Sequence, residues 1–434
     1  MPNTRVGSMR RSRLKRCGGL NHARRSRPRA VLGEASLAKL HPMNRHWEHD
    51  ALRGLMLVLM TLTHLPTRWS DPLGQPFGFV SAAEGFVFLS AYLAGKVYTQ
   101  RNQKRGEDEM RGAFLRRALK IYACQVALLA FAFTVIAALG LAVSQPAVTD
   151  MLSYYINQPW TALAASLLLL YNPPLLDILP MYILFMVASP VVLLHGLRNG
   201  WGWLFAISLV LWVAAQFEVE KLIYALAVAV AGLRVPLDQT GAFELVAWQF
   251  LWLLGLWMGA QDAAPDAPKR VFPPWMVMVA WAYAVVCLVW RHAVGQSPFP
   301  AAPGLNMLFD KWRLGPLRLI DFMVLLLLTM HHGERLKQWL PRSAFLETLG
   351  RAALPVFCAH LVAVLLALAL VGAAKPERHW GVDLAVLLTT FLVLWTVARA
   401  TEIADERTKA LREKISVRRR RRSGGLAPSP GAPQ

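Results

Sequence analysis

The stretch AALPVFCAHLVAVLLALALVGAA, residues 352–374, runs for 23 residues without an Asp, Glu, Lys or Arg. An α-helix needs about 20 predominantly apolar residues to cross the hydrocarbon core of a bilayer. The stretch therefore predicts a membrane-spanning helix, and His360 is the one histidine in it. An imidazole inside such a helix is a candidate functional group, although a buried histidine with a satisfied hydrogen bond is the simpler alternative.

Other apolar stretches of similar length occur on both sides along the chain. Together the predicted spans are 51–67, 78–98, 118–143, 178–195, 201–217, 242–260, 274–294, 314–331, 352–374 and 381–401. This pattern predicts an all-α fold, a polytopic integral membrane helical bundle of about ten transmembrane helices. The stretches 160–171 and 221–234 are apolar but short, and we expect interfacial or re-entrant segments there.

The net charge of +21 is concentrated at the two ends of the chain. Residues 1–45 hold 12 Lys and Arg against one acid, and residues 399–434 hold 10 against four, so the ends carry +17. A basic nucleic-acid-binding domain is therefore not indicated. We predict a disordered basic extension over 1–45, with Met43 as an alternative start, a membrane domain over 46–401, and a disordered basic cytoplasmic tail over 402–434. A lipid-surface anchor is the alternative for the extension.

The distribution of basic residues between loops predicts the orientation of the bundle. If the N-terminus is cytoplasmic, the internal cytoplasmic loops carry 15 Lys and Arg, eight of them in 96–120. The outer loops then carry eight, and the long loop 144–177 carries none. Because Lys and Arg are enriched on the cytoplasmic side of membrane proteins, both termini are predicted to be cytoplasmic.

Several kinds of chemistry have no motif in this chain. The four cysteines form no C-x-x-C pair, so neither a disulfide framework nor a zinc site is predicted. No phosphate-binding loop, dinucleotide-binding glycine pattern or H-E-x-x-H metal motif occurs. We therefore expect no metal and no bound cofactor.

The first predicted span carries the densest set of ionisable groups, in Asp50-Ala-Leu-Arg53-Gly54 and His64. Arg53 and His64 are 11 residues apart, which places them on roughly one face of a helix and about 16 Å apart in depth. Asp50 is one turn from Arg53, within reach of an ion pair. Histidine is the usual general base near neutral pH, so His64 is a candidate catalytic residue. The alternatives are a boundary histidine and a snorkelling arginine.

The second predicted span contains Glu84 among small residues, and Ser90 is a further polar residue in it. It runs from outside to inside, so Glu84 is predicted at the depth of His64, where a carboxylate would orient the imidazole. The small residues between 81 and 91 favour close helix packing, which is a sufficient explanation for them alone.

Weaker candidates for substrate binding lie further along the chain. Tyr182 follows the polar stretch 171–177, where an outer loop re-enters a span. Lys311, Arg313, Arg318 and Asp321 cluster at the outer start of the eighth span. These groups are expected either to hold an acidic substrate group or to pair with one another and with Asp310.

These residues resemble the OpgC family of membrane succinyltransferases, which modify osmoregulated periplasmic glucans and are similar to the membrane acyltransferase-3 superfamily. The superfamily's Arg and His, separated by ten residues, fall on Arg53 and His64. Its Ser-Gly falls on Ser90-Ala91, where this chain departs from the glycine. The resemblance covers roughly residues 45–400 and is weaker beyond the first two spans.

The resemblance implies a membrane acyltransferase domain over 46–401 in the bacterial inner membrane. It implies succinyl-CoA as the cytoplasmic acyl-CoA donor and hydroxyls of a periplasmic glucan as the acceptor. By the resemblance, His64 would be the catalytic base and Arg53 would support the site or the donor. From the residues themselves, we expect Glu84 to orient His64, and Arg53 with the basic stretch 96–120 to attract the phosphates of CoA. The remaining candidates for substrate binding are Asp50, Ser90, Tyr182, Arg318, Asp321 and His360. The lipid bilayer is an expected partner and nucleic acid is not, while the oligomeric state is not predicted.

Three other functions fit the same sequence features. An acetyltransferase of another surface glycan would share the catalytic residues. A proton-coupled transporter or flippase would use the buried charges differently. A membrane scaffold would use the basic ends to bind anionic lipid.

Overall fold

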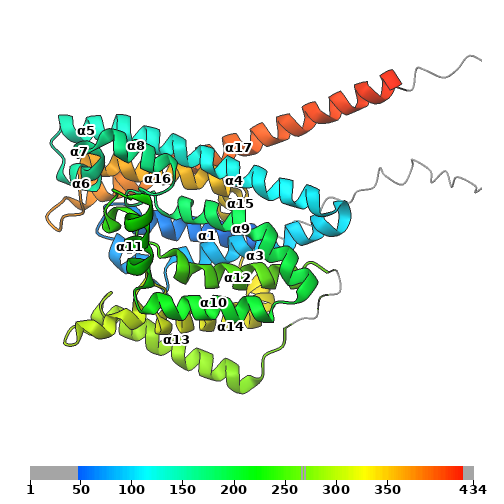
Figure 1. Cartoon of the computed structure of the whole chain (residues 1–434), viewed down its shortest axis with the longest axis horizontal. Helices are drawn as coiled ribbons and strands as arrows, with labels where there is room; N and C mark the ends of the chain where they lie inside the picture. The colour runs from blue at the N-terminus through cyan, green and yellow to red at the C-terminus, as the bar shows by residue number, and fades with distance from the viewer. Residues whose placement is uncertain (1–46, 265–266, 268–269, 424–434) are drawn as a thin grey trace, which may run out of the picture. The chain divides into compact units, whose positions relative to one another are not determined.

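The computed structural model describes residues 47–264, 267 and 270–423, with side chains described as far as residue 416. Across these residues all regular secondary structure is helical, as predicted (Figure 1). The predicted extension 1–45 and the last part of the predicted tail, 424–434, lie outside the described residues.

The helices follow one another with short connections. In chain order they are α1 (Trp47–His64), α2 (Ser70–Gly74), α3 (Ala82–Arg105), α4 (Glu107–Phe131), the π-helix η2 (Ala132–Ile136), α5 (Ala137–Ala142), α6 (Pro146–Met151), α7 (Ser153–Asn157), α8 (Pro159–Leu167), α9 (Ile178–Asn199), α10 (Gly202–Gln216), α11 (Val219–Ala231), η3 (Leu237–Gln239), α12 (Leu245–Gln261), α13 (Pro274–Val294), η4 (Pro303–Phe309), α14 (Pro316–Trp339), α15 (Ala344–Arg351), α16 (Ala353–Val371) and α17 (Trp380–Ser423).

A helix occupies each of the ten predicted spans, but the helices differ in whether they are long and apolar enough to cross a membrane. Among the described residues, five helical stretches are long and apolar enough: 107–142, 178–199, 274–294, 353–371 and 380–416. A sixth is obtained if α10 and α11, which meet at a bend of 87°, form one broken span. The protein is therefore membrane-embedded, and the number ten stays a prediction.

The two short apolar stretches form helices that cannot cross a bilayer alone. Residues 160–171 contribute α8, which has nine residues, and 221–234 contribute most of α11, which has 13. Because a spanning helix needs about 20 residues, α8 is too short. The bend between α10 and α11 fits a broken span or a re-entrant segment, so the interpretation of residues 221–234 as interfacial or re-entrant stays a prediction.

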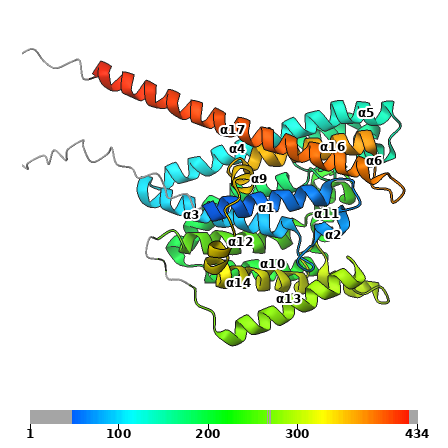
Figure 2. The same cartoon turned by 180° about the vertical axis from the view of Figure 1, so that it is seen from behind.

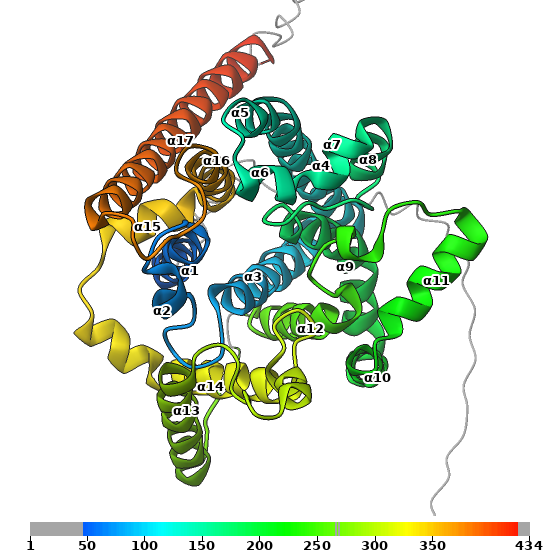
Figure 3. The same cartoon turned by 90° about the vertical axis from the view of Figure 1, so that its left-hand side faces the viewer.

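Helix α3 lies near the centre of the bundle, and α1 packs beside it. Seen along the bundle (Figure 3), α12 and α9 flank α3, while α15 and α16 flank α1, and α17 lies outside them. The buried core is continuous across these helices and includes Leu57 of α1, Phe88 of α3, Trp248 of α12 and Phe357 of α16. The candidate catalytic residues on α1 and α3 therefore lie on helices that pack against this core.

Glycines bring the central helices close together. A Cβ atom on Gly259 of α12 would overlap the carbonyl oxygen of Tyr92 in α3, and one on Gly255 would lie 2.6 Å from the carbonyl oxygen of Phe88. Between α1 and α15, a Cβ on Gly54 would overlap the carbonyl oxygen of Leu346. Small residues at such contacts let helix backbones approach, which is how membrane helices pack without a hydrophobic driving force between them.

The two ends of the bundle carry different segments. Figures 1 and 2 both show the turn between α3 and α4 at the same end as the C-terminal part of α17. Helices α2 and α5–α8 lie at the opposite end. The basic loop 96–120 and the helical part of the basic tail therefore share one end, although the orientation of the bundle in the membrane stays a prediction.

Helix α17 differs from the predicted disordered tail. It continues from the last predicted span to Ser423, so residues 402–423 are helical. The physical reason is composition, because Ala, Glu, Lys, Arg and Leu are strong helix formers and residues 402–423 contain no Gly or Pro. Glu402 also pairs with Arg399 in the same helix and with Arg351 of α15, which supports the junction.

Candidate active site in two cavities

Helix α1 presents ionisable side chains to two separate cavities. Arg53 lines a cavity of about 180 Å³, which we call the Arg53 cavity. His64, the last residue of α1, lines a second cavity of about 400 Å³, the His64 cavity. The predicted 11-residue spacing thus separates the two groups into different cavities on one side of the helix.

The Arg53 cavity combines basic and hydroxyl groups with an apolar wall. Its lining includes Arg117 of α4, Tyr98 and Ser90 of α3, and Tyr182 of α9. Arg53 also forms the predicted ion pair with Asp50, one turn earlier in α1. Ser90 and Tyr182 therefore line a cavity, and their substrate-binding role stays a prediction. Asp50 lines neither cavity and forms its ion pair with Arg53.

The His64 cavity is larger and carries charges of both signs. Lys311, from the connection between η4 and α14, faces it together with Asp177 and Asn172. Ser81, Ala82 and Ala83 also line it, so the N-terminus of α3 opens on this cavity. The backbone N–H groups of Ser81 and Ala83 at this helix end are bonded to the Glu84 carboxylate and the Ser81 hydroxyl, so the helix end is already capped.

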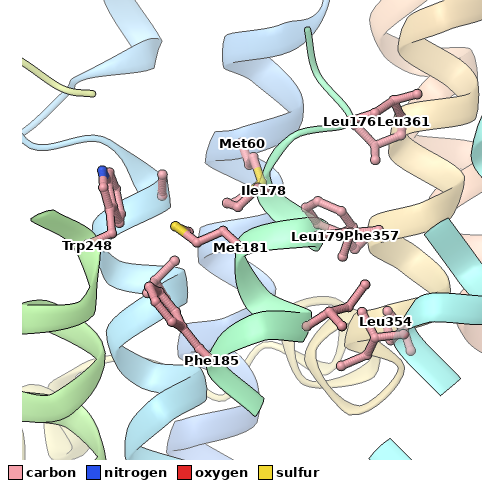
Figure 4. Packing of buried hydrophobic residues seen from close by; sticks show 14 of the residues in the cluster. Met60, Leu176, Ile178, Leu179, Met181, Phe185, Trp248, Leu354, Phe357 and Leu361 are labelled. Carbon is pink, nitrogen blue, oxygen red and sulfur yellow. The ribbon is translucent and has the colours of Figure 1, made fainter. Parts of the chain in front are cut away.

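Only a thin apolar layer separates the two cavities. Met60 and Ile178 line the His64 cavity, while Leu179 and Phe357 line the Arg53 cavity. All four are at most 7% exposed and belong to one packed cluster, where Figure 4 shows Met60 beside Ile178 and Leu179 beside Phe357. Ile178 and Leu179 are neighbours in the chain, so one layer of side chains divides the cavities.

His64 is paired with His360, 296 residues away in α16. The Nδ1 atom of His64 lies 3.2 Å from Nε2 of His360, and the two rings are stacked with an interplanar angle of 17°. On its other side, Nδ1 of His360 lies 2.7 Å from the carbonyl oxygen of Phe357. His360 is fully buried and His64 is half-buried at the cavity wall.

This chain of contacts assigns the protons on both rings. A carbonyl oxygen can only accept, so Nδ1 of His360 carries hydrogen and donates to Phe357. In the uncharged imidazole, which burial favours, Nε2 of His360 then accepts from Nδ1–H of His64. The lone pair of His64 is consequently on Nε2, which is the arrangement a general base needs.

The prediction that Glu84 orients His64 is wrong. One oxygen of Glu84 accepts from Nε of Arg318, and the other accepts from the backbone N–H and the hydroxyl of Ser81, at 3.0 and 2.6 Å. Glu84 is at the third position of α3 and closes a capping box with Ser81, which turns its side chain back onto its own helix. His360 occupies the position that was predicted for Glu84.

Arg318 and Asp321 line neither cavity, contrary to the prediction of substrate contacts. Both are buried in α14, and Asp321 accepts the backbone N–H of Phe79 at 2.8 Å. With Glu84 they hold the segment that enters α3. Gly78 in this segment has φ of +115°, and a Cβ there would lie 2.7 Å from a carboxylate oxygen of Asp321. Both charges are engaged inside the protein, but the partners differ from the alternative given by the sequence: Arg318 pairs with Glu84 and Asp321 with the Phe79 backbone, not with each other or with Asp310.

Sequence reasoning gave no specific role to Arg117 or Asn172, and grouped Lys311 with Arg318. Arg117 was one of eight basic residues in 96–120, and nothing in its spacing separates it from its neighbours. Lys311 and Arg318 are seven residues apart, yet one faces the cavity and the other is buried in α14. The signal that distinguishes them is the start of α14 at Pro316, which leaves Lys311 in the connection.

Comparisons with known proteins identify a single family. Neither curated proteins nor solved structures give a match. A family model described as OpgC protein matches residues 45–406. The match contains α1, α3 and both cavities, and it covers most of the chain, so the protein belongs to the OpgC family.

Proposed function

We propose that this protein is an inner-membrane O-acyltransferase that moves a succinyl group from cytoplasmic acyl-CoA to hydroxyls of a periplasmic glucan. Membership of the OpgC family indicates acyltransferase-type activity in glucan modification. The observation that carries the finer proposal is the pair of cavities along α1. Arg53 faces one, His64 faces the other, and only an apolar layer separates them.

The two cavities suit two different substrates. The Arg53 cavity offers Arg117, Tyr98 and Tyr182 to a donor that carries phosphates on a long flexible arm. The His64 cavity offers carboxylate and amide groups of Asp177, Asp238 and Asn172, which suit sugar hydroxyls. In this arrangement the donor thioester reaches the apolar layer from one side and the acceptor hydroxyl reaches it from the other.

The transfer needs one base and one site for developing negative charge. Nε2 of His64 takes the proton of the sugar hydroxyl while its oxygen bonds to the thioester carbonyl carbon. The carbon–sulfur bond then breaks, the thiolate receives the proton from His64, and the products are the glucan ester and the free thiol. The ammonium of Lys311 is the cation at the same cavity, and a positive charge there favours the negative charge that develops on the carbonyl oxygen.

The experiment is the His64→Ala substitution in a strain that lacks the native gene. A general base is worth about 10²–10⁴ in rate, so we expect acylation of the glucan to fall to that extent while the protein still inserts in the membrane. The readout is the mass spectrum of the isolated glucan, with loss of a succinyl rather than an acetyl substituent identifying the acyl group.

His331→Ala is the matched control. His331 is an exposed histidine of α14 that lines neither cavity, so its removal should leave the glucan unchanged. Near-normal acylation by His64→Ala would refute the assignment of the base. Turnover of succinyl-CoA with soluble glucan by the purified protein, without an ion gradient, separates this proposal from a transporter.

A further inference from the structure

Lys311 differs from three largely buried arginines of the bundle, because each arginine has a carboxylate partner. Arg318 pairs with Glu84, Arg291 pairs with Asp71, and Arg378 pairs with Asp383. Within the part of the chain that the structure describes, no carboxylate lies within ion-pair distance of Nζ of Lys311. Asp177 faces the same cavity, but its Oδ2 accepts the backbone N–H of Ala242 at 3.0 Å.

Aromatic rings fix the position of the ammonium group. Nζ of Lys311 lies 4.6 Å from the centroid of the Trp312 ring and 5.9 Å from that of Phe243. Both rings line the His64 cavity beside Lys311. A cation held over ring faces keeps its N–H donors available, because the rings attract the charge without accepting conventional hydrogen bonds.

The surroundings leave the positive charge of Lys311 poorly compensated. Burial, together with the nearby guanidinium of Arg318, lowers the pKa of Lys311 from its usual value, and Glu84 and Asp177 offset this only in part. A carboxylate that bound at Nζ would reverse this effect, since an opposite charge nearby favours the ammonium form. The cavity wall around it includes Met60 and Ile178, and such apolar surroundings strengthen a charge pair.

We propose that Lys311 binds the free carboxylate of a dicarboxylic acyl group and thereby selects succinyl over uncharged acyl groups. This rests on the proposed acyl transfer, in which the donor enters from the Arg53 cavity and its acyl end projects past the apolar layer toward His64. The reacting carbonyl is then beside His64, and the far carboxylate of the same acyl group lies in the cavity that Lys311 lines.

The test compares two donors in the purified full-length protein. Succinyl-CoA carries the terminal carboxylate, and butyryl-CoA has the same chain length without it; an unsubstituted glucose oligosaccharide is the common acceptor. Lys311→Met should lower kcat/KM for succinyl-CoA about 10- to 100-fold, the range of one charge-assisted hydrogen bond, and leave butyryl-CoA unchanged. Lys311→Arg keeps the cation and should retain most of the preference for succinyl-CoA.

A binding measurement supports the same assignment without turnover. Succinate should raise the thermal unfolding temperature of the native protein more than butyrate does, and Lys311→Met should remove this difference. Lys375→Met is the matched control, because Lys375 is exposed and lines neither cavity, and it should behave as the native protein in both assays.

The outcomes separate the two levels of the proposal. Equal loss with both donors in Lys311→Met would place the ammonium at the reacting carbonyl and overturn the carboxylate assignment, as would an unchanged preference for succinyl-CoA. A native protein that transfers neither acyl group would refute the proposed function itself, and the role of Lys311 with it. Transfer of butyryl with undiminished rate by the native protein would leave acyl transfer standing but exclude the selectivity.

Discussion

The two cavities are built from the same central helices but are stabilised in different ways. In the Arg53 cavity, a local ion pair positions Arg53, because its partner Asp50 is three residues earlier in α1. The His64 cavity depends on partners far apart in sequence: His360 for the imidazole and Arg318 for the N-terminus of α3. The comparison indicates that one helix can position its own charged side chain at a cavity, whereas the orientation of a base requires other helices.

The buried Glu84–Arg318 pair should show the largest effect on stability. Arg318→Met leaves the buried Glu84 without its cationic partner, and removing one partner of such a pair costs about 3–5 kcal/mol. We expect a large fall in the thermal unfolding temperature in detergent. The double variant Glu84→Gln, Arg318→Met should recover much of the loss, because no buried charge then lacks a partner.

The control for this prediction is Arg116→Met. Arg116 pairs with Glu109 at the surface, and its side chain is 62% exposed, so its loss should cost at most about 1 kcal/mol. If the double variant were less stable than Arg318→Met alone, the capping contacts of Glu84 with Ser81 would outweigh its pairing with Arg318, and the account of the pair would be wrong.

The His64–His360 contact should show an intermediate effect, confined to turnover. His360→Ala removes the acceptor for Nδ1–H of His64, and one hydrogen bond of this kind is worth about tenfold in rate. We expect kcat to fall by about that factor, with KM for both substrates unchanged. His360→Gln keeps an acceptor near the position of Nε2 and should restore part of kcat.

Rescue by glutamine is the decisive part of this measurement. A histidine that only filled space in α16 would give equal losses in both variants, accompanied by a lower unfolding temperature. Full activity in His360→Ala would show that the imidazole of His64 is oriented by its own helix alone.

A substitution in the Arg53 cavity should have the smallest effect, and it should change KM for acyl-CoA. Arg117→Ala removes one of its two arginines, and a partly exposed contact to phosphate should raise KM for acyl-CoA about threefold to tenfold. The dependence of this KM on ionic strength should also weaken, because one screened charge pair is lost. KM for the glucan serves as the internal control, and a change there instead would reverse the assignment of the two cavities.

Local features of the chain determined much of this structure. Apolar runs of the required length gave the helices, including α16 around His360 and α9 before Arg198. Spacing along one helix determined the Asp50–Arg53 ion pair. This prediction holds because residues three apart in a helix have a fixed geometry that does not depend on the rest of the fold.

Tertiary packing alone decided the partners of the buried charges. Glu84 and His64 were predicted at one depth, yet depth does not specify direction, and a capping interaction with Ser81 turned Glu84 toward Arg318. His64 and His360 are 296 residues apart, and no local sequence signal indicates that they meet. The sequence by itself determined which groups are buried in the bundle, while the packing of the helices determined which of them meet, because contacts between helices are set by the fit of many side chains at once.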